Sequence, residues 1–363
     1  MGGARGEGVV GPGAGGDAAG GDARVSGGGL SEVGGGRGRL LDRIVEMLDG
    51  AGSVVITTHA NADGDGAGSA AALAAFLRAR GTEAWIVNPT PFPEPFAFLL
   101  PDPRWAVPAA SEEAARRCRE ADLAVVVDTA ELPRIGRVKS LIRDLPKVVI
   151  DHHPEGKRPI GGVVLRDLQA CAAGALVFEL IDRAGGPWSP DIARALYIAV
   201  LTDTGGFRFT NTNPECLRVA ARLVELGAVP EELYRAAYGR FRPHRFELLR
   251  ESLATLTVHE SGRIAWITVP KEAYDRLGAT VDDLEGFVDV PRSVAGVEVA
   301  ILFRTTSDGR IKVSLRSLPP VDVHVIAVEL GGGGHMRAAA AVVKGPLEAA
   351  VQRVVGRVGE ELR

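Results

Sequence analysis

The chain has 363 residues, 46% of them apolar, and a formal charge of −4. This is enough apolar material for two domains with separate cores, and it excludes a broad basic surface for long nucleic acid. The three cysteines are widely spaced without a CxxC pair, which excludes a disulfide framework and a zinc ribbon and fits a reducing cytoplasm. No apolar run reaches the roughly 18 to 20 residues of a spanning helix, and no signal peptide is evident, so we expect a cytoplasmic protein.

Residues 1–37 are predicted to be a disordered tail. Sixteen of the first 36 residues are glycine and large apolar side chains are almost absent, so the segment cannot bury enough surface to offset the entropy of ordering. Order is expected to begin near Arg39. From there, large apolar residues recur at helical spacing, namely Leu40, Leu41, Ile44, Val45 and Leu48.

Over residues 38–245, short apolar runs alternate with helical patterns. The runs SVVIT, AWIV, LAVVV and KVVID are interpreted as strands, and longer patterns such as GSAAALAAFLRAR as helices. This alternation predicts an α/β domain with a mostly parallel sheet flanked by helices. A second, smaller α/β domain is predicted for residues 246–363, joined through a long helical segment near residues 241–260.

Acidic and imidazole side chains follow four apolar segments. We interpret each segment as a strand that ends just before the polar residues. SVVITT precedes His59, Asp63 and Asp65; LAVVV precedes Asp128; KVVI precedes Asp151, His152 and His153; and YIAVLT precedes Asp203. The carboxyl ends of parallel strands meet at one edge of a sheet, where ligands of open α/β sheets bind. Aspartates gathered there would repel one another unless cations neutralised them, so we predict a metal site.

The mixture of carboxylates and imidazoles favours Mn²⁺ or Mg²⁺, with Fe or Co²⁺ as further candidates, over structural zinc. The candidate ligands are too many for one ion. Two divalent cations about 3.5 to 4 Å apart, sharing one carboxylate, would hold the attacking and leaving oxygens of a phosphoryl displacement. We therefore expect two cations and take Mn²⁺ as the first choice.

Taken together, these motifs resemble those of a known family. HANADGD, VVVDT, DHH and LTDTGGF stand in the order of the four motifs of the DHH phosphoesterase superfamily. GGGGH at residues 331–335 is similar to the signature of the associated C-terminal substrate domain. The resemblance extends over residues 38–345, and five motifs in one order make it specific.

The resemblance implies a role for each polar residue. The first cation would be held by His59 and Asp63, the second by Asp65, His152 and Asp203, with Asp128 as the bridge. His153 would contact the scissile phosphate or protonate the leaving oxygen. Asp151 would orient the neighbouring imidazoles, as metal-bound histidines require.

Phosphate recognition is expected from the C-terminal domain. Glycines let backbone N–H groups approach an anion closely, so phosphate would be bound by Gly332, Gly333, Gly334 and His335. Arg304 and Arg316, on the neighbouring strand patterns VEVAILFR and VSLRS, would add guanidinium contacts. Without the resemblance, the glycine run would be read as a flexible loop and the arginines as surface side chains.

The C-terminal region carries nearly balanced charges, which favours a short substrate over a long polymer. The chain resembles the bacterial stand-alone members of the superfamily, the nanoRNases or oligoribonucleases, several of which also dephosphorylate adenosine 3′,5′-bisphosphate. The segment ALYIAVLTDTGGFRFTNTNPE is especially similar to theirs. The implied substrates are therefore short RNA, dinucleotides and adenosine 3′,5′-bisphosphate. We expect no partner among long nucleic-acid duplexes or membranes. Formation of a homodimer stays an open question.

Alternative interpretations stay open at this point. The same metal chemistry would serve a linear or cyclic dinucleotide phosphodiesterase in second-messenger turnover, and a catalytically silent nucleotide-binding sensor is an alternative of another class. The GGGGH motif disfavours a manganese-dependent inorganic pyrophosphatase. For single residues, a polar turn at 59–65 or helix caps at Asp128 and Asp203 are the plainer explanations, but their joint occurrence argues for a metal site.

Overall fold

The computed structural model describes residues 31–239 and 242–363. The chain divides into two compact units, Met1–Tyr234 and Arg235–Arg363, whereas the sequence places the boundary at residue 245. Residues 1–30 of the expected tail lie outside the described residues. Helix α1 (Ser31–Asp49) begins earlier than the expected start near Arg39. The Arg37 side chain pairs with Glu179 at 2.6 Å, which ties this part of α1 to α5.

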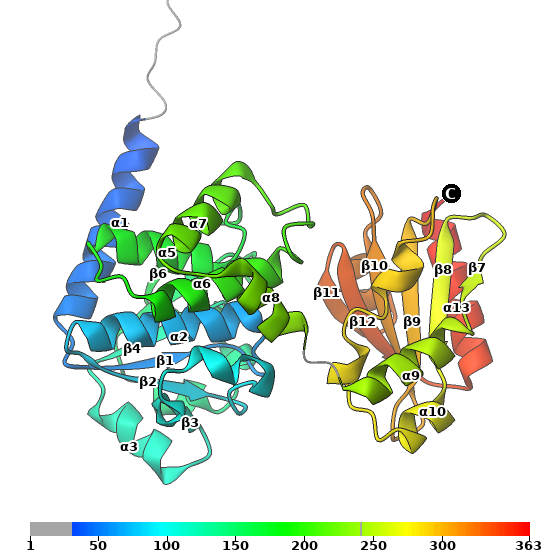
Figure 1. Ribbon diagram of the computed structural model, residues 1–363, viewed down its shortest axis with the longest axis horizontal. Helices are drawn as coiled ribbons and strands as arrows, with labels where there is room; N and C mark the ends of the chain where they lie inside the picture. The colour runs from blue at the N-terminus through cyan, green and yellow to red at the C-terminus, as the bar shows by residue number, and fades with distance from the viewer. Residues whose placement is uncertain (1–30, 240–241) are drawn as a thin grey trace, which may run out of the picture. The chain divides into compact units, whose positions relative to one another are not determined.

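Six strands form the sheet of the N-terminal unit, in the order β3-β2-β1-β4-β5-β6 with every neighbouring pair parallel (Figure 1). The strands are β1 (Ser53–Thr57), β2 (Glu83–Asn88), β3 (Ala106–Pro108), β4 (Leu123–Val127), β5 (Lys147–Asp151) and β6 (Val163–Arg166). The predicted parallel sheet is therefore confirmed. The order reverses between β1 and β4, and ligands of open α/β sheets bind beyond the carboxyl ends of the strands at such a switch point.

Helices cover both faces of this sheet (Figure 1). One face carries α2 (Gly64–Ala79), α5 (Ala173–Arg183) and α6 (Pro190–Asp203), with α7 (Pro214–Glu225) packed on α6. The other face carries α3 (Glu112–Glu120) and α4 (Val138–Leu141). Helix α8 (Pro230–Tyr238) follows α7 in the chain. The strands are covered on both faces, which explains their nearly continuous apolar runs.

Small residues on α2 let α6 approach it closely. A Cβ atom at Gly68 would lie 2.4 Å from the Ala195 carbonyl oxygen, and one at Gly64 would lie 2.4 Å from Thr202 Oγ1. The first turn of α2 and the last turn of α6 therefore lie side by side. One of the four predicted strand ends is thus wrong, because Asp203 is the last residue of a helix. It still reaches the sheet edge, since α6 ends beside the start of α2.

The C-terminal unit contains a second six-stranded sheet, in the order β11-β12-β10-β9-β8-β7, in which only β8 and β9 are parallel. The strands are β7 (Thr257–Val258), β8 (Ile264–Val269), β9 (Val299–Thr305), β10 (Ile311–Ser317), β11 (Gly333–His335) and β12 (Ala338–Val343). One core, on one face, includes α12 (Val323–Glu329) and α13 (Leu347–Glu361). The other core includes residues of α9 (Pro243–Leu253) and α10 (Lys271–Arg276) and those directly before α11 (Asp289–Arg292), which itself packs on β8 and β9. The second α/β domain is confirmed.

The helix expected over residues 241–260 is shorter than predicted. Helix α9 ends at Leu253 and is followed by β7, which pairs with β8. Thr255 directs this change, because its Oγ1 accepts the N–H of Thr268 at 2.7 Å and lies 3.1 Å from the Thr268 carbonyl oxygen. Leu248 is fully buried against this sheet, so α9 is part of the C-terminal core.

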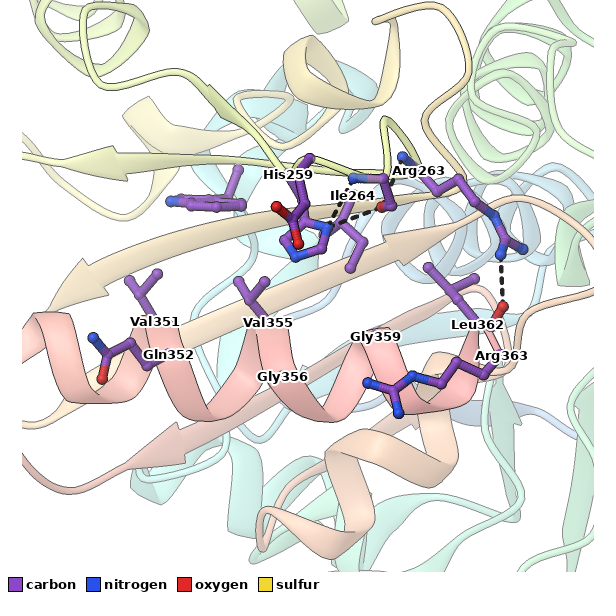
Figure 2. A pocket seen from close by; sticks show the side chains of 13 residues that line it. His259, Arg263, Ile264, Val351, Gln352, Val355, Gly356, Gly359, Leu362 and Arg363 are labelled. Carbon is purple, nitrogen blue, oxygen red and sulfur yellow. Dashed lines mark hydrogen bonds between the residues drawn. The ribbon is translucent and has the colours of Figure 1, made fainter.

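A pocket of about 520 Å³ lies between the β7–β8 hairpin and α13 (Figure 2). Ile264, Val351 and Val355 line it, together with Arg263, which pairs with Glu298. It lies at the β7 edge of the sheet, opposite the edge formed by β11. Across the described ranges, no helix is long and apolar enough to cross a membrane.

Candidate metal centre

The six predicted metal ligands converge at the carboxyl edge of the N-terminal sheet. They fall into two groups, each with its ligand atoms within 4.8 Å of one another: His59 with Asp63 and Asp128, and Asp65 with His152 and Asp203. A third group of the same kind joins Asp128 to His152 and His153. Residues that are far apart in the sequence therefore form one cluster, and this arrangement matches the division between two cations that the family resemblance implies.

His59 follows β1 and is buried, with its Nε2 atom 3.1 Å from Asp128 Oδ2 and 3.9 Å from Asp63 Oδ2. Its Nδ1 atom lies 3.0 Å from the Ala60 carbonyl oxygen, which fixes the ring and points Nε2 at the carboxylates. Asp63 is the N-cap of α2, and its Oδ1 accepts the N–H groups of Asp65 and Gly66. One oxygen of Asp63 thus caps the helix, while the other faces His59.

Asp128 directly follows β4 and is 2% exposed. Its two oxygens face different groups, since Oδ2 lies beside His59 while Oδ1 is 3.6 Å from His152 Nε2. This is the arrangement that a bridging carboxylate requires. A Cβ atom at Gly66 would lie 3.3 Å from Asp128 Oδ2 and 2.6 Å from Thr58 Oγ1, so only glycine leaves this space.

His152 lies at the centre of the second group. Its Nε2 atom is 3.6 Å from Asp65 Oδ2 and 3.7 Å from Asp203 Oδ2, while Nδ1 lies 3.2 Å from the Ala170 carbonyl oxygen. The distances from Nε2 are too long for hydrogen bonds. They suit atoms that surround one ion, because ligands at about 2.1 Å from a metal lie roughly 3 to 4 Å apart.

Two buried atoms in this cluster have no hydrogen-bond partner among the described residues, namely Asp128 Oδ1 and His152 Nε2. Burial of a polar atom without a partner is costly. A cation between them would satisfy both atoms, and carboxylate with imidazole is a donor set that divalent metals accept. The residues present therefore fit the metal centre that the sequence predicts.

The crowded charges shift the pKa values of the ligands. Burial disfavours the charged His59 ring, but Asp128 and Asp63 outweigh it and raise its pKa to about 10. Burial also opposes the charge on His152, while Asp128 and Asp65 raise its pKa to about 10. Burial, reinforced by Asp128, raises the pKa of Asp65 and brings that of Asp203 to about 6. Without metal, both histidines therefore hold their protons at neutral pH.

Asp65 is held by the first turn of α5. Its Oδ2 accepts the N–H of Ala173 at 2.6 Å, and its Oδ1 accepts the N–H of Gly174 at 2.8 Å and the hydroxyl of Ser69 at 3.1 Å. The sequence did not indicate these backbone donors, because only the fold brings α5 to α2. It also missed Asn211, whose side chain contacts Asp203 at 3.2 Å. The quoted segment TNTNPE contained that residue but gave it no role.

Asp151 and His153 form a pair beside the metal ligands. Asp151 is 1% exposed, and its Oδ1 accepts the backbone N–H of His153 at 3.2 Å and lies 2.8 Å from His153 Nδ1. The same Nδ1 is 3.7 Å from Asp128 Oδ1, which is why His153 also falls into a possible ligand group. The shorter contact with Asp151 favours an orienting pair over a third metal position.

The residues expected to bind phosphate lie on the second sheet. Directly paired residues of antiparallel strands share a face, and the register pairs Arg316 with Ala338 and Ala338 with His335. Arg304 pairs with Lys312, which stands four residues before Arg316 on the same face. Arg304, Arg316 and His335 therefore occupy one face. The small side chain of Ala338 stands between Arg316 and His335.

The glycine run forms strand β11 instead of the flexible loop or open phosphate nest considered from the sequence. The N–H of Gly332 donates to the Ala327 carbonyl oxygen at 2.7 Å, and the expected phosphate contact of Gly332 stays a prediction. A Cβ atom at Gly332 would lie 2.0 Å from the Ala340 carbonyl oxygen, and one at Gly334 would lie 2.5 Å from that of Ala338. These glycines are therefore required for the close approach of β11 to β12.

Three cations line a small pocket of about 170 Å³ on this face: Arg304, Lys312 and Arg316. Within the described part of the chain, none of the three forms an ion pair, and burial lowers the pKa of Arg316. Glu285 lines the same pocket and the charge of Asp289 acts on Arg316, but three half-buried cations outnumber these carboxylates, which favours an anionic ligand. Lys312 was missed by sequence reasoning, although its alternation with Ser314 and Arg316 along RIKVSLRS was the available signal.

The doubly covered parallel sheet, with carboxylates and histidines gathered at its switch point, defines a DHH-type phosphoesterase fold. Residues 53–200 match the DHH family, N-terminal domain, and residues 267–362 match the DHHA1 domain. The predicted resemblance is confirmed, and the chain belongs to the DHH family.

Three known proteins illustrate the relationship. The chain is 35% identical over 329 residues to the bifunctional oligoribonuclease and PAP phosphatase NrnA of Thermus thermophilus, covering 89% of this chain and 94% of that protein. It is 26% identical to the cyclic-di-AMP phosphodiesterase PdeA of Listeria monocytogenes, over 62% of this chain and 34% of that protein. The crystal structure of an exopolyphosphatase-related protein from Bacteroides fragilis matches with a TM-score of 0.83 and 27% identity, covering 89% and 96% of the two chains.

Proposed function

We propose that the chain is a divalent-metal-dependent hydrolase that degrades short oligoribonucleotides to mononucleotides and removes the 3′-phosphate of adenosine 3′,5′-bisphosphate. The observation that carries this proposal is the pair of ligand groups that meet at Asp128. The choice of substrates is supported by the 35% identity to the Thermus thermophilus relative over nearly all of its length. Short RNA arises inside cells, so the proposal includes a cytoplasmic location.

In this proposal each of the two ligand groups described above holds one cation. His59 and Asp63 would hold the first cation, Asp65, His152 and Asp203 would hold the second, and Asp128 would contribute to both. A pair of divalent cations, for which we propose Mn²⁺ ahead of Mg²⁺ or Co²⁺, supplies Lewis acidity to the attacking water and to the leaving oxygen.

The protein's own groups would perform the remaining steps. Asp151 fixes the His153 ring through Nδ1, and His153 would give a proton at Nε2 to the departing oxygen. Arg304, Lys312 and Arg316 would bind a phosphate of the substrate, because their positive charges suit an anionic group. Gly333, Gly334 and His335 would border the same face.

The test is a hydrolysis assay with purified protein and Mn²⁺. Substrates are 5′-labelled RNAs from two to about twenty nucleotides and adenosine 3′,5′-bisphosphate. We expect the highest kcat/KM on the shortest RNAs, release of phosphate from the bisphosphate, and loss of both activities on chelation. Equal rates on all RNA lengths, or no turnover with any cation, would contradict the proposal.

A second candidate is hydrolysis of linear or cyclic dinucleotides in second-messenger turnover. The similarity to the Listeria cyclic-di-AMP phosphodiesterase favours it, although this chain matches only 34% of that protein. Adding cyclic di-AMP and pApA to the same assay separates the two candidates. A preference for cyclic di-AMP over short RNA would select the second candidate, and binding of nucleotides without turnover would select a sensor.

A further inference from the structure

The loop at residues 169–172 and the first turn of α5 that follows it support two ligands of the second group. The Ala170 carbonyl oxygen of the loop lies 3.2 Å from His152 Nδ1, so it orients that ring. Three residues later the chain enters α5, whose first backbone N–H groups hold both oxygens of Asp65. The same short segment therefore contacts both His152 and Asp65.

Asn211 connects the third ligand of the group to the same loop. Its Nδ2 atom lies 2.8 Å from the Cys171 carbonyl oxygen, and 3.2 Å from both the carbonyl oxygen and Oδ2 of Asp203. Asp203 is the last residue of α6, where a helix end is free to fray. The amide side chain thus ties this helix end to the loop that carries the supports of His152 and Asp65.

The contacts require an amide in one orientation. The atom at the Nδ2 position faces three oxygen acceptors, so it must be a donor, and a carboxylate there would repel Asp203. Burial strengthens the requirement, since repulsion between carboxylates grows as water is excluded.

We infer that Asn211 is a positioning residue for the second cation, setting Asp203 relative to His152 and Asp65. The inference rests on the proposed metal centre and is independent of the identity of the substrate. Asn211 touches no reacting atom, so its removal would change the affinity of one cation site and leave the other site intact.

The chain offers a matched control two residues further on. Asn213 Nδ2 donates to the Gln169 carbonyl oxygen at 2.8 Å, in the same loop, and Asn213 Oδ1 accepts the N–H of Cys216 as the N-cap of α7. It is therefore the same residue type with the same loop contact. It makes no contact with a metal ligand, so Asn213→Ala reports the structural cost of loosening the loop.

The experiment titrates metal-free wild type, Asn211→Ala, Asn211→Asp and Asn213→Ala with Mn²⁺ by calorimetry, and records the electron paramagnetic resonance of the Mn²⁺ pair. Wild type should bind two cations. Asn211→Ala should weaken one site by about 10- to 100-fold, as does the loss of a residue that hydrogen-bonds to a metal ligand. Asn211→Asp should weaken the same site further. Asn213→Ala should keep both affinities and the coupled-pair spectrum.

The outcomes separate this inference from the proposed function. Wild type that binds fewer than two cations would refute the metal centre itself. Two tight sites in Asn211→Ala, or equal weakening in Asn213→Ala, would overturn only the role of Asn211. If Asn211→Ala does not fold, as judged by thermal unfolding of the metal-free protein, Asn211→Gln takes its place, because the longer chain keeps an amide while displacing it from Asp203.

Discussion

Asp128 illustrates how much of this site is decided at a single residue. It is buried, it lies between two ligand groups, and it adopts a φ of +61°, in the left-handed region that non-glycine residues seldom occupy. Such strain persists only where the surrounding structure enforces it, and it concentrates at functional sites. The backbone N–H of Asp128 still donates to the Ile150 carbonyl oxygen at 2.8 Å, so β5 holds the residue in this conformation.

Replacing Asp128 by asparagine should affect both cations. Asn keeps the size of the side chain but removes the charge that both ligand groups share, so we expect each Mn²⁺ affinity to fall by more than about 100-fold, beyond the usual effect of residues behind the ligands. Hydrolysis should fall at least as far. Calorimetry and the RNA assay measure this, with Asp144→Asn at an exposed position as the control. Activity within a few-fold of wild type would contradict the bridging role.

The raised pKa values predict that cation binding releases protons. In the metal-free protein His59 and His152 have pKa values of about 10, so both are protonated at neutral pH and must lose their protons to bind a metal. Titration at pH 7.5 in buffers of different ionisation enthalpy should show release of about two protons. Cation affinity should therefore rise with pH. A heat of binding that does not depend on the buffer would contradict this prediction.

The same pKa shifts predict how the free energy of unfolding of the metal-free protein depends on pH. A histidine whose pKa is raised on folding stabilises the native state fully below its unfolded value of about 6.5. That stabilisation is lost as the pH rises through about 10, the folded value for His59 and His152. The free energy of unfolding should thus fall between these values without metal, and urea titrations at several pH values would measure the slope.

At the scale of elements, the contact between α2 and α6 positions the second cation site. Asp65 lies in the first turn of α2 and Asp203 in the last turn of α6, and Gly68 lets the two helices approach. The interaxial distance of packed helices depends on the side chains at their contact. A larger residue there would move the two carboxylates apart.

Gly68→Ala should therefore destabilise the protein and weaken the second cation site. The new Cβ would lie 2.4 Å from the Ala195 carbonyl oxygen, and overpacking of this kind costs about 1 to 3 kcal/mol. Gly359→Ala is the control, because on α13 the new Cβ meets nothing within 4 Å and should stabilise the helix by about 0.5 to 1 kcal/mol. Urea midpoints measure both changes. Equal urea midpoints for the two variants would contradict this explanation of the packing.

At the scale of the whole molecule, the two units have separate cores and different expected tasks. All six expected metal ligands belong to the N-terminal unit, while the three cations Arg304, Lys312 and Arg316 belong to the C-terminal unit. A fragment of residues 31–239 should therefore still bind two Mn²⁺ ions but lose most of its activity on RNA. Calorimetry and the RNA assay test this. Failure of a folded fragment to bind metal would show that the C-terminal unit is needed to form the site.

The sequence alone determined the parallel sheet, the family and the candidate ligands, because these depend on local patterns. The apolar runs SVVIT, AWIV, LAVVV and KVVID all form strands, and the polar residues of TTHANADGDG and VVIDHH follow two of them directly. The segment before Asp203 was wrongly predicted to be a strand. Asp203 was still identified as a candidate metal ligand, because the motif LTDTGGF marks the residue irrespective of its secondary structure.

Only the tertiary structure decided how these residues are supported. The amides of α5 that hold Asp65, the Asn211 contact with Asp203 and the grouping of Lys312 with Arg304 all join segments that the sequence leaves unrelated. The end of the glycine run, Gly333 and Gly334, also forms strand β11, because β12 pairs with it. The physical reason is that motifs record which atoms are available, whereas packing between distant segments fixes where those atoms lie and what surrounds them.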